Sequence, residues 1–175
     1  MSSQDHRRRL DRAIVIALGG NLPFEGRPVQ AVLEAALERM EAGGLTLWAR
    51  SGWWRSQAWP DPADAPFLNG IVLAEGQGGP DEVLALLHAI EVQFGRRRGR
   101  DNAPRALDLD LIAHGRTVLD GPGLRLPHPR ASDRAFVMRP LAEIAPDWVH
   151  PVTGKSAAVL AKGAAVGADA APAAQ

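Results

Sequence analysis

Two amphipathic helical patterns, each lying between short apolar runs, restrict the fold of this chain more than any other feature of its sequence. In residues 28–42 the apolar side chains recur at intervals of three and four, which is the period of a helix with one buried face, and Gly43 follows the pattern. Residues 80–94 repeat this arrangement, with Pro80 in the first turn and Gly95 after the last one. Both segments are predicted to be helices that pack on a sheet.

Four short segments around these helices have the pattern of strands. They are residues 13–18, 45–54, 67–74 and 107–113, each of them an apolar run or an alternation of apolar and polar residues. A further short helix is expected from Phe136 to Ile144. The order strand, helix, strand, strand, helix, strand is that of a split β-α-β unit. We therefore predict an α+β fold of the ferredoxin-like type, with a mainly antiparallel sheet flanked by helices.

The length of the chain, 175 residues, suits one ordinary globular domain. We expect this domain to span residues 13–162, after a polar N-terminal arm formed by residues 1–12. Residues 163–175 are mostly alanine and have no hydrophobic periodicity, so we expect a disordered tail there.

Composition excludes several classes of protein. The sequence has no cysteine, which excludes disulfides, a thiolate metal site and a cysteine nucleophile. It has no apolar run long enough to cross a bilayer, and its N-terminus is too polar for a secretory signal, so we expect a cytoplasmic protein with no membrane partner. The formal net charge of zero disfavours a nucleic-acid partner. We expect a monomer.

The segment from Leu107 to Leu111 alternates leucine with aspartate. On a strand, alternate residues point to the same face, so Asp108 and Asp110 are expected to project together, with Cα atoms about 6.6 Å apart. Two carboxylates at that distance repel each other unless a cation lies between them, and Mg²⁺ is commonly held by such a pair together with substrate phosphates. Taken alone, the pattern also suits a half-exposed strand with solvated acids.

A dense group of arginines precedes this strand. Its members are Arg96, Arg97, Arg98, Arg100 and Arg105. Arginines beside a carboxylate pair are suited to a nucleoside triphosphate, because guanidinium groups bind phosphate oxygens while the acids hold the bridging metal. A solvated surface loop and a nucleic-acid-binding loop are the alternatives, although the second lacks aromatic side chains of the RNA-recognition type.

Phe67 and Asn69 form a second candidate site. As alternate residues of a strand they share a face, which offers an apolar ring beside an amide. A planar heterocycle could stack on the ring and form hydrogen bonds with the amide. A core phenylalanine with an asparagine at a strand irregularity near Gly70 explains the pair equally well.

Seven segments, taken in order, resemble one family, the 6-hydroxymethyl-7,8-dihydropterin pyrophosphokinases of folate biosynthesis. They are IALGGN, FLN at Phe67–Asn69, IE at Ile90-Glu91, GRRR at Gly95–Arg98, PRALDLDLI at Pro104–Ile112, LPH at Leu126–His128, and RAFVMRPLAEIAP at Arg134–Pro146. The resemblance implies transfer of the β,γ-diphosphate of ATP, the co-substrate, to the hydroxymethyl oxygen of the pterin, with release of AMP. It also implies two Mg²⁺ ions.

The same resemblance implies a role for each matching residue. Asp108 and Asp110 correspond to metal ligands, and Arg96 and Arg105 to catalytic arginines. Pterin contacts correspond to Ser56, Phe67, Asn69 and Phe136, and ATP contacts to Glu91, Arg98, Ile112, His128 and Arg134. The chain departs from the family where Asn102-Ala103 stands in place of a frequent Trp-Gly. This departure leaves a non-catalytic family member as an alternative.

Overall fold

The computed structural model describes residues 2–58, 61–96 and 105–174 of the chain. Its elements in chain order are α1 (Ser3–Leu10), β1 (Ile14–Gly20), α2 (Val29–Ala42), β2 (Thr46–Arg50), β3 (Trp54–Ser56), β4 (Phe67–Glu75), α3 (Pro80–Gln93), β5 (Asp108–His114), β6 (Leu119–Asp120), β7 (Arg125–Leu126), the 3₁₀ helix η1 (Ala131–Asp133), α4 (Ala135–Ile144), α5 (Ala157–Gly163) and β8 (Ala171–Pro172). The two helices predicted from periodicity, α2 and α3, are both present.

A six-stranded sheet forms the centre of the molecule. Its strand order is β5-β1-β4-β3-β8, and β2 also pairs with β4. The pairs β1–β4, β1–β5, β2–β4 and β3–β4 are all antiparallel. Since β2 and β3 are consecutive and both pair with β4, the order corresponds to the ferredoxin-like arrangement, and the predicted α+β class is confirmed.

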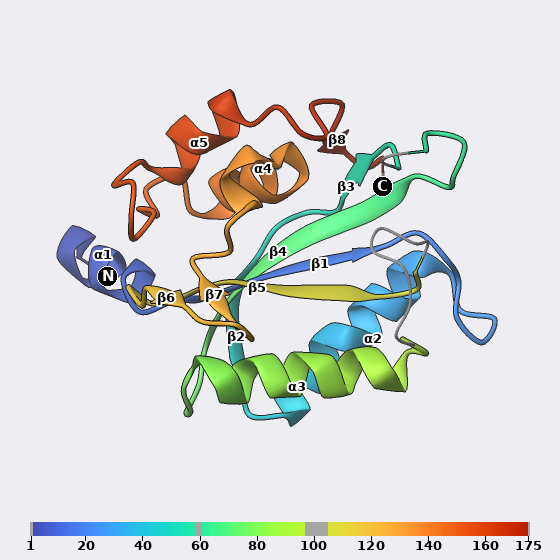
Figure 1. Ribbon diagram of the computed structural model, residues 1–175, viewed down its shortest axis with the longest axis horizontal. Coiled ribbons are helices and arrows are strands. Elements are labelled where there is room, and N and C mark those ends of the chain that lie inside the picture. The colour runs from blue at the N-terminus through green and yellow to red at the C-terminus, as the bar shows by residue number, and fades with distance from the viewer. Residues whose placement is uncertain (1, 59–60, 97–104, 175) are drawn as a thin grey trace.

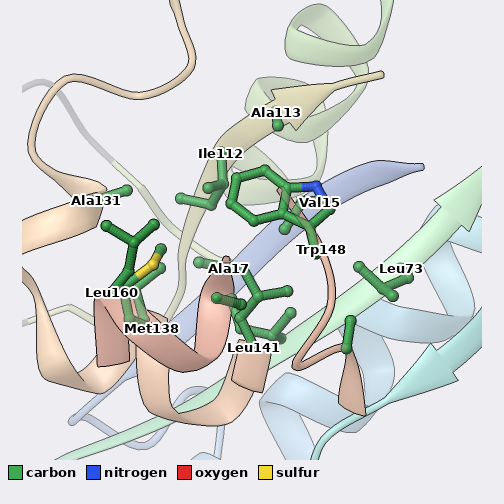
Figure 2. Close-up of a cluster of buried hydrophobic side chains, with 14 of the residues drawn as sticks. Val15, Ala17, Leu73, Ile112, Ala113, Ala131, Met138, Leu141, Trp148 and Leu160 are labelled. Atoms are coloured by element: carbon green, nitrogen blue, oxygen red, sulfur yellow. The ribbon is translucent and has the colours of Figure 1, made fainter. Parts of the chain in front are cut away.

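Helices cover both faces of the sheet (Figure 1). On one face α2 and α3 pack against Ile14, Ile16 and Leu18 of β1. On the other face α4 and α5 pack against the alternate residues Val15 and Ala17. The aromatic centre of this second cluster is Trp148, which is 2% exposed and lies among the side chains drawn in Figure 2. Because side chains alternate along a strand, β1 contributes to two separate cores.

The predicted strand 45–54 is interrupted. The pairing of β2 with β4 shifts its register between Leu47 and Ala49, and β2 ends at Arg50 before β3 begins at Trp54. A bulge of this kind moves the following side chains to the opposite face. The alternation in residues 45–54 predicts that Leu47 and Ala49 face the same way, and this prediction is wrong. Leu47 packs in the α2–α3 core whereas Ala49 packs in the α4–α5 core.

Both ends of the described chain differ from the sequence expectations. Residues 3–10 of the polar arm form α1, which begins with a capping box between Ser2 and Asp5, and Leu10 is 4% exposed in the α4–α5 core. The tail expected to be disordered instead forms β8, which pairs with β3, and Ala170 is 2% exposed in the same core. No helix in the described ranges is long and apolar enough to span a bilayer.

Candidate active site

A cavity of about 590 Å³ opens on the α4–α5 side of the sheet, at the end of β1. Its lining comes from β1, the end of β3, the beginning of β4, β5, the η1–α4 region and the C-terminal segment: Ala17, Leu18, Gly19, Ser56, Gln57, Phe67, Asn69, Arg105, Asp108, Asp110, Arg130, Asp133, Arg134, Phe136, Val137, Ala165, Val166 and Gly167. Most of the residues predicted for the site are among them. A second hollow, of about 610 Å³, is lined by arginines of α1 and, among the described residues, by none of those predicted for the site.

The two aspartates of β5 point into the cavity, as the alternation predicted. Leu107, Leu109 and Leu111 are at most 3% exposed and lie in the opposite core. The side chains of Asp108 and Asp110 are 30% and 33% exposed. The leucines therefore fix the face of the strand on which both carboxylates stand.

Strand register places the second predicted pair beside the first. In β1, Gly19 pairs with Asn69 of β4 on one side and with Asp108 of β5 on the other. Directly paired residues point to the same face of a sheet, and neighbouring strands lie about 4.8 Å apart, so Asn69 and Asp108 stand about 10 Å apart across the floor of the cavity. Gly19 between them has no side chain, and a Cβ there would lie 3.2 Å from Asn69 Oδ1.

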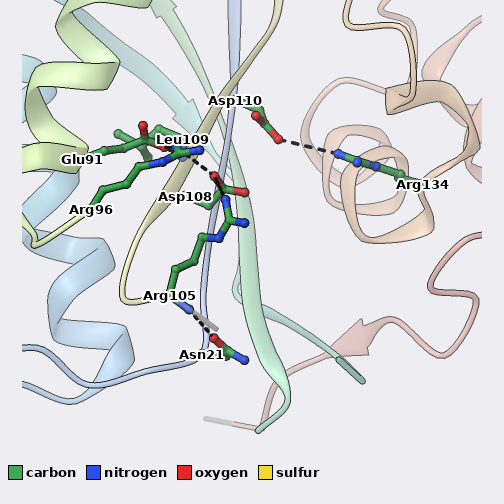
Figure 3. Close-up of polar contacts among 8 residues, drawn as sticks. All are labelled: Asn21, Glu91, Arg96, Arg105, Asp108, Leu109, Asp110 and Arg134. Carbon is green, nitrogen blue, oxygen red and sulfur yellow. Dashed lines mark hydrogen bonds and ion pairs between the residues drawn. The ribbon is translucent and has the colours of Figure 1, made fainter. Parts of the chain in front are cut away.

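Glu91 of α3 contacts β5 from the side opposite the cavity. It is 1% exposed, and its Oε1 accepts a hydrogen bond of 2.7 Å from the backbone N–H of Leu109 in β5. The same oxygen pairs with the guanidinium of Arg96, whose Nη1 lies 3.2 Å from Asp108 Oδ1. Burial raises the pKa of Glu91 to about 7, although the Leu109 hydrogen bond and Arg96 both lower it. Figure 3 shows this chain of contacts.

Arg105 approaches Asp108 from the other side. Its Nη1 lies 2.9 Å from Asp108 Oδ1, and its backbone N–H donates a hydrogen bond of 3.0 Å to Asn21 Oδ1 (Figure 3). Asn21 is 4% exposed, and its Nδ2 also donates to the carbonyl of Ala65 at 2.9 Å. Asn21 thus positions Arg105, a role that its turn sequence did not reveal.

Asp110 faces two further basic groups. Its Oδ2 lies 3.7 Å from Arg134 Nη1, and partial burial, followed by the neighbouring Asp108, raises its pKa. The charges of His128 and Arg134 act in the opposite direction. Burial lowers the pKa of His128, whose Nδ1 accepts a hydrogen bond of 3.2 Å from the N–H of Arg130.

Aromatic and amide groups form the opposite wall. The side chains of Phe67 and Phe136 both line the cavity, and the guanidinium of Arg134 lies 5.7 Å from the centroid of the Phe136 ring. Asn69 Nδ2 donates a hydrogen bond of 3.0 Å to Ser56 Oγ, which fixes the orientation of the amide with its oxygen toward Gly19. An apolar ring and a fixed amide are the groups expected for a planar heterocycle.

Some predicted residues lie elsewhere. Ile112 is 1% exposed in the α4–α5 core, and the structure does not bring its side chain to the cavity; its carbonyl accepts a hydrogen bond of 2.8 Å from the N–H of His128. Three further predicted residues are not part of the cavity lining: Glu91, Arg96 and His128. Arg96, which pairs with Glu91, contacts the lining residue Asp108, and His128 lies near the lining residue Asp110. Arg98 lies outside the described residues, as does Asn102-Ala103, where the chain departs from the family pattern.

The donor set of the site suits a hard divalent cation. Among the described residues, no cluster of three or more histidine, cysteine, aspartate or glutamate side chains could hold a metal ion by itself. Asp108 and Asp110 supply oxygen ligands alone, which is the partial set that Mg²⁺ takes when substrate phosphates complete its coordination. The arrangement therefore suits a metal that arrives with a phosphorylated ligand.

Comparisons with known proteins match the chain to one family. The family described as 7,8-dihydro-6-hydroxymethylpterin-pyrophosphokinase matches residues 15–146. The 2-amino-4-hydroxy-6-hydroxymethyldihydropteridine pyrophosphokinase of Synechocystis sp. is 43% identical over 143 residues, which are 81% of this chain and 71% of the relative. The protein of the same name from Pseudomonas aeruginosa is 40% identical over 139 residues, 79% of this chain and 83% of the relative.

Longer proteins also contain a similar unit. The folic acid synthesis protein fol1 of Pneumocystis carinii is 34% identical over 148 residues, which are 85% of this chain but 20% of the relative. The crystal structure of Plasmodium falciparum HPPK-DHPS with pteroate superposes with a TM-score of 0.68 at 12% identity, covering 86% of this chain and 44% of that one. This likeness concerns the fold. The family match ends at residue 146, so the C-terminal part of the cavity lies beyond it.

Proposed function

The chain belongs to the 7,8-dihydro-6-hydroxymethylpterin-pyrophosphokinase family, and we propose that Asp108 and Asp110 hold the Mg²⁺ with which it works. It transfers the diphosphoryl group of ATP to 6-hydroxymethyl-7,8-dihydropterin in folate synthesis, giving the pterin diphosphate and AMP. Its dependence on Mg²⁺, the binding of two ions and the residue roles given below are parts of the proposal.

One observation supports these roles above the others. The pairing of Gly19 with Asn69 and with Asp108 puts the amide and the carboxylate in one row across three strands. A heterocycle bound at Asn69 and a polyphosphate bound through a metal at Asp108 would then meet over Gly19. Both groups stand on the same face of the sheet, in one cavity.

The basic side chains around the carboxylates are suited to the phosphates. Arg96 and Arg105 both contact Asp108, and Arg134 contacts Asp110, so three guanidinium groups lie within reach of anions bound there. Arginine forms strong, directed hydrogen bonds to phosphate oxygens and stays protonated at neutral pH. We assign Arg96 and Arg105 to the transferred phosphates, and Glu91, Arg98, His128 and Arg134 to the side of ATP. Ile112 receives no ligand contact in this proposal, because its side chain is buried in the α4–α5 core.

The pterin occupies the opposite wall in this proposal. Its ring stacks between Phe67 and Phe136, while Asn69 and Ser56 bind its polar edge. The hydrogen bond from Asn69 to Ser56 holds the amide in place before the ligand arrives, which lowers the entropic cost of binding.

Transfer requires attack of the hydroxymethyl oxygen on the β-phosphorus, cleavage of the bond from that phosphorus to the oxygen of AMP, and loss of the hydroxyl proton. Asp108 and Asp110 would hold the Mg²⁺, which would supply neutralisation of the negative charge on the phosphates. The chain's own groups orient both substrates and stabilise developing negative charge with the arginines, so no protein nucleophile takes part. We also propose that the enzyme acts as a monomer in the cytoplasm, and its formal net charge of zero disfavours a nucleic-acid partner.

The test combines purified protein, ATP, Mg²⁺ and 6-hydroxymethyl-7,8-dihydropterin, and follows the nucleotide products by chromatography. AMP is expected only when the pterin and Mg²⁺ are both present. Asp110→Ala is expected to abolish turnover while the cooperative unfolding transition is retained. Full activity in Asp110→Ala would contradict the metal role, ADP as product would contradict the transferred group, and pterin binding without AMP would indicate a non-catalytic member of the family.

A further inference from the structure

Residues 164–172, the C-terminal segment, run along the cavity beyond the part of the chain that matches the family. Val166 forms a parallel bridge with Arg134, its N–H donates to the carbonyl of Asp133 at 2.8 Å, and its carbonyl accepts from the N–H of Ala135 at 2.8 Å. Ala165, Val166 and Gly167 contribute to the cavity lining. The segment is therefore part of the wall, attached to the start of α4.

Gly167 lies directly against the ring of Phe136. Its φ is +67°, a conformation that residues with a Cβ rarely adopt, and a Cβ built there would lie 2.5 Å from Cδ1 of Phe136. A Cβ is essentially never found so close to another heavy atom, so any larger residue would require the Phe136 ring or the segment itself to shift. The small size of this residue thus sets the place of one of the two rings proposed to hold the heterocycle.

Asp169 reaches the other wall. Its Oδ2 accepts a hydrogen bond of 2.5 Å from the backbone N–H of Gln57, which follows Ser56 at the end of β3. Ser56 Oγ in turn accepts the hydrogen bond from Asn69 Nδ2. Beside it, β8 pairs with β3 through Pro172 and Ala171. The carboxylate of Asp169 therefore restrains the end of β3, where Ser56 orients the amide of Asn69.

Arg139 of α4 holds the segment between these two contacts. Its Nη1 donates hydrogen bonds to the carbonyl of Ala168 at 2.9 Å and to the carbonyl of Ala170 at 2.6 Å. Ala170 is 2% exposed in the core beneath. These two hydrogen bonds fix the backbone of the segment to α4, and Asp169 fixes the segment to the end of β3. The segment therefore links the positions of α4 and the end of β3.

We propose that the C-terminal segment sets the width and shape of the pterin pocket, with Gly167 positioning the Phe136 ring and Asp169 positioning Ser56 and Asn69. Both are positioning residues, because they act through side chains that line the pocket. The inference rests on the proposed function for the identity of the ligand. It extends the pterin-binding unit past residue 162, where the sequence placed the end of the domain.

The experiment measures the dissociation constant of 6-hydroxymethyl-7,8-dihydropterin from its own fluorescence, with Mg²⁺ and α,β-methylene ATP present so that no turnover occurs. Gly167→Ala is expected to raise this constant about tenfold. Gly154→Ala is the matched control, since Gly154 has the same φ of +67° but nothing within 4 Å of the point that a Cβ would occupy. Both variants carry the same backbone strain, and only one meets the ring.

Asp169 supplies a second, independent variant. Asp169→Ala is expected to raise the pterin dissociation constant several-fold, whereas Asp169→Asn, which keeps an oxygen acceptor for the N–H of Gln57, is expected to restore most of the affinity. The dissociation constant of the nucleotide, measured by calorimetry, is expected to stay within about twofold of the wild type in every variant. A general loss of structure would change both constants together.

The outcomes separate this inference from the proposed function. If Gly167→Ala binds the pterin as Gly154→Ala does, or if the nucleotide constant rises equally, the positioning role is refuted. If the wild type binds the pterin but forms no AMP from ATP, diphosphoryl transfer is refuted while the ratio of pterin constants still decides the role of the segment. A wild type that does not bind the pterin would refute both.

Discussion

Replacing Glu91 by glutamine removes a carboxyl group that is 1% exposed and lies behind the proposed metal ligands. Glutamine has the same shape and keeps an oxygen that can accept the hydrogen bond from the N–H of Leu109. It cannot ionise, and it does not pair with the charge of Arg96. The substitution therefore removes one titrating group from the interior with little change in packing.

The expected magnitude follows from the pKa of this carboxyl group, which burial raises from 4.5 to about 7. Between these two values the folded protein binds a proton that the unfolded chain has released, so the free energy of unfolding falls as pH rises. The contribution of the protonated Glu91 to the free energy of unfolding is complete below pH 4.5 and is lost as the pH rises through 7. At about 1.4 kcal/mol for each pH unit it amounts to about 3 kcal/mol, most of which is lost between pH 5 and pH 8.5.

Urea unfolding of the wild type and of Glu91→Gln at several pH values between 5 and 8.5 measures this contribution. A cost of the glutamine that does not depend on pH lowers the free energy of unfolding of the variant equally at every pH. The quantity to compare is therefore how the difference between the free energies of unfolding of wild type and variant changes with pH. We expect the free energy of unfolding of the wild type to fall by about 2–3 kcal/mol more than that of the variant over this range. Curves that stay parallel would refute the raised pKa of Glu91.

Glu34 provides a matched control for this measurement. Its hydrogen bonds with Arg50, at 2.6 and 2.7 Å, lower its pKa below 4.5. Above pH 5 it is therefore ionised in both the folded and the unfolded chain. Glu34→Gln is expected to leave the slope between pH 5 and pH 8.5 as it is in the wild type.

Three further substitutions test other parts of the structure. Gly19→Ala places a Cβ 3.2 Å from Asn69 Oδ1 and is expected to weaken pterin binding several-fold by fluorescence, with unchanged nucleotide binding. Asn21→Ala removes the acceptor for the N–H of Arg105 and is expected to cost about 1–3 kcal/mol in urea unfolding and to lower the rate of AMP formation. Trp148→Ala is expected to cost about 3–5 kcal/mol in the same unfolding assay while the folded protein keeps its pterin affinity.

Side-chain pattern was enough to predict much of the fold and the most informative part of the site. The alternation of leucine and aspartate in β5 predicted the correct face for Asp108 and Asp110, because the leucines of a half-buried strand point into the core and leave the other face to the aspartates. The same reasoning placed Phe67 and Asn69 on a common face of β4, and both line the cavity. In each case burial of apolar residues determines where the polar ones point.

Features that depend on backbone hydrogen bonds could not be predicted in this way. The bulge between Leu47 and Ala49 leaves the composition of the segment unchanged, yet it moves the later side chains to the other face. The C-terminal segment is held largely through its carbonyls, by Arg139, and through its pairing with β3. An alanine-rich sequence gives no periodic signal for contacts of that kind, which is why it suggested disorder.

The position of the site depends on the register of β1 more than on any single side chain. The pairing of β1 with β5 shifts between Val15 and Ile16, and only beyond this irregularity does Gly19 stand opposite Asp108. A slip by one residue would turn both aspartates of β5 into the α2–α3 core and bring leucines into the cavity. Burying two carboxylates without partners costs several kcal/mol. The alternation of leucine and aspartate therefore enforces the register that brings Asp108 within about 10 Å of Asn69. The same two aspartates hold the metal in our proposal.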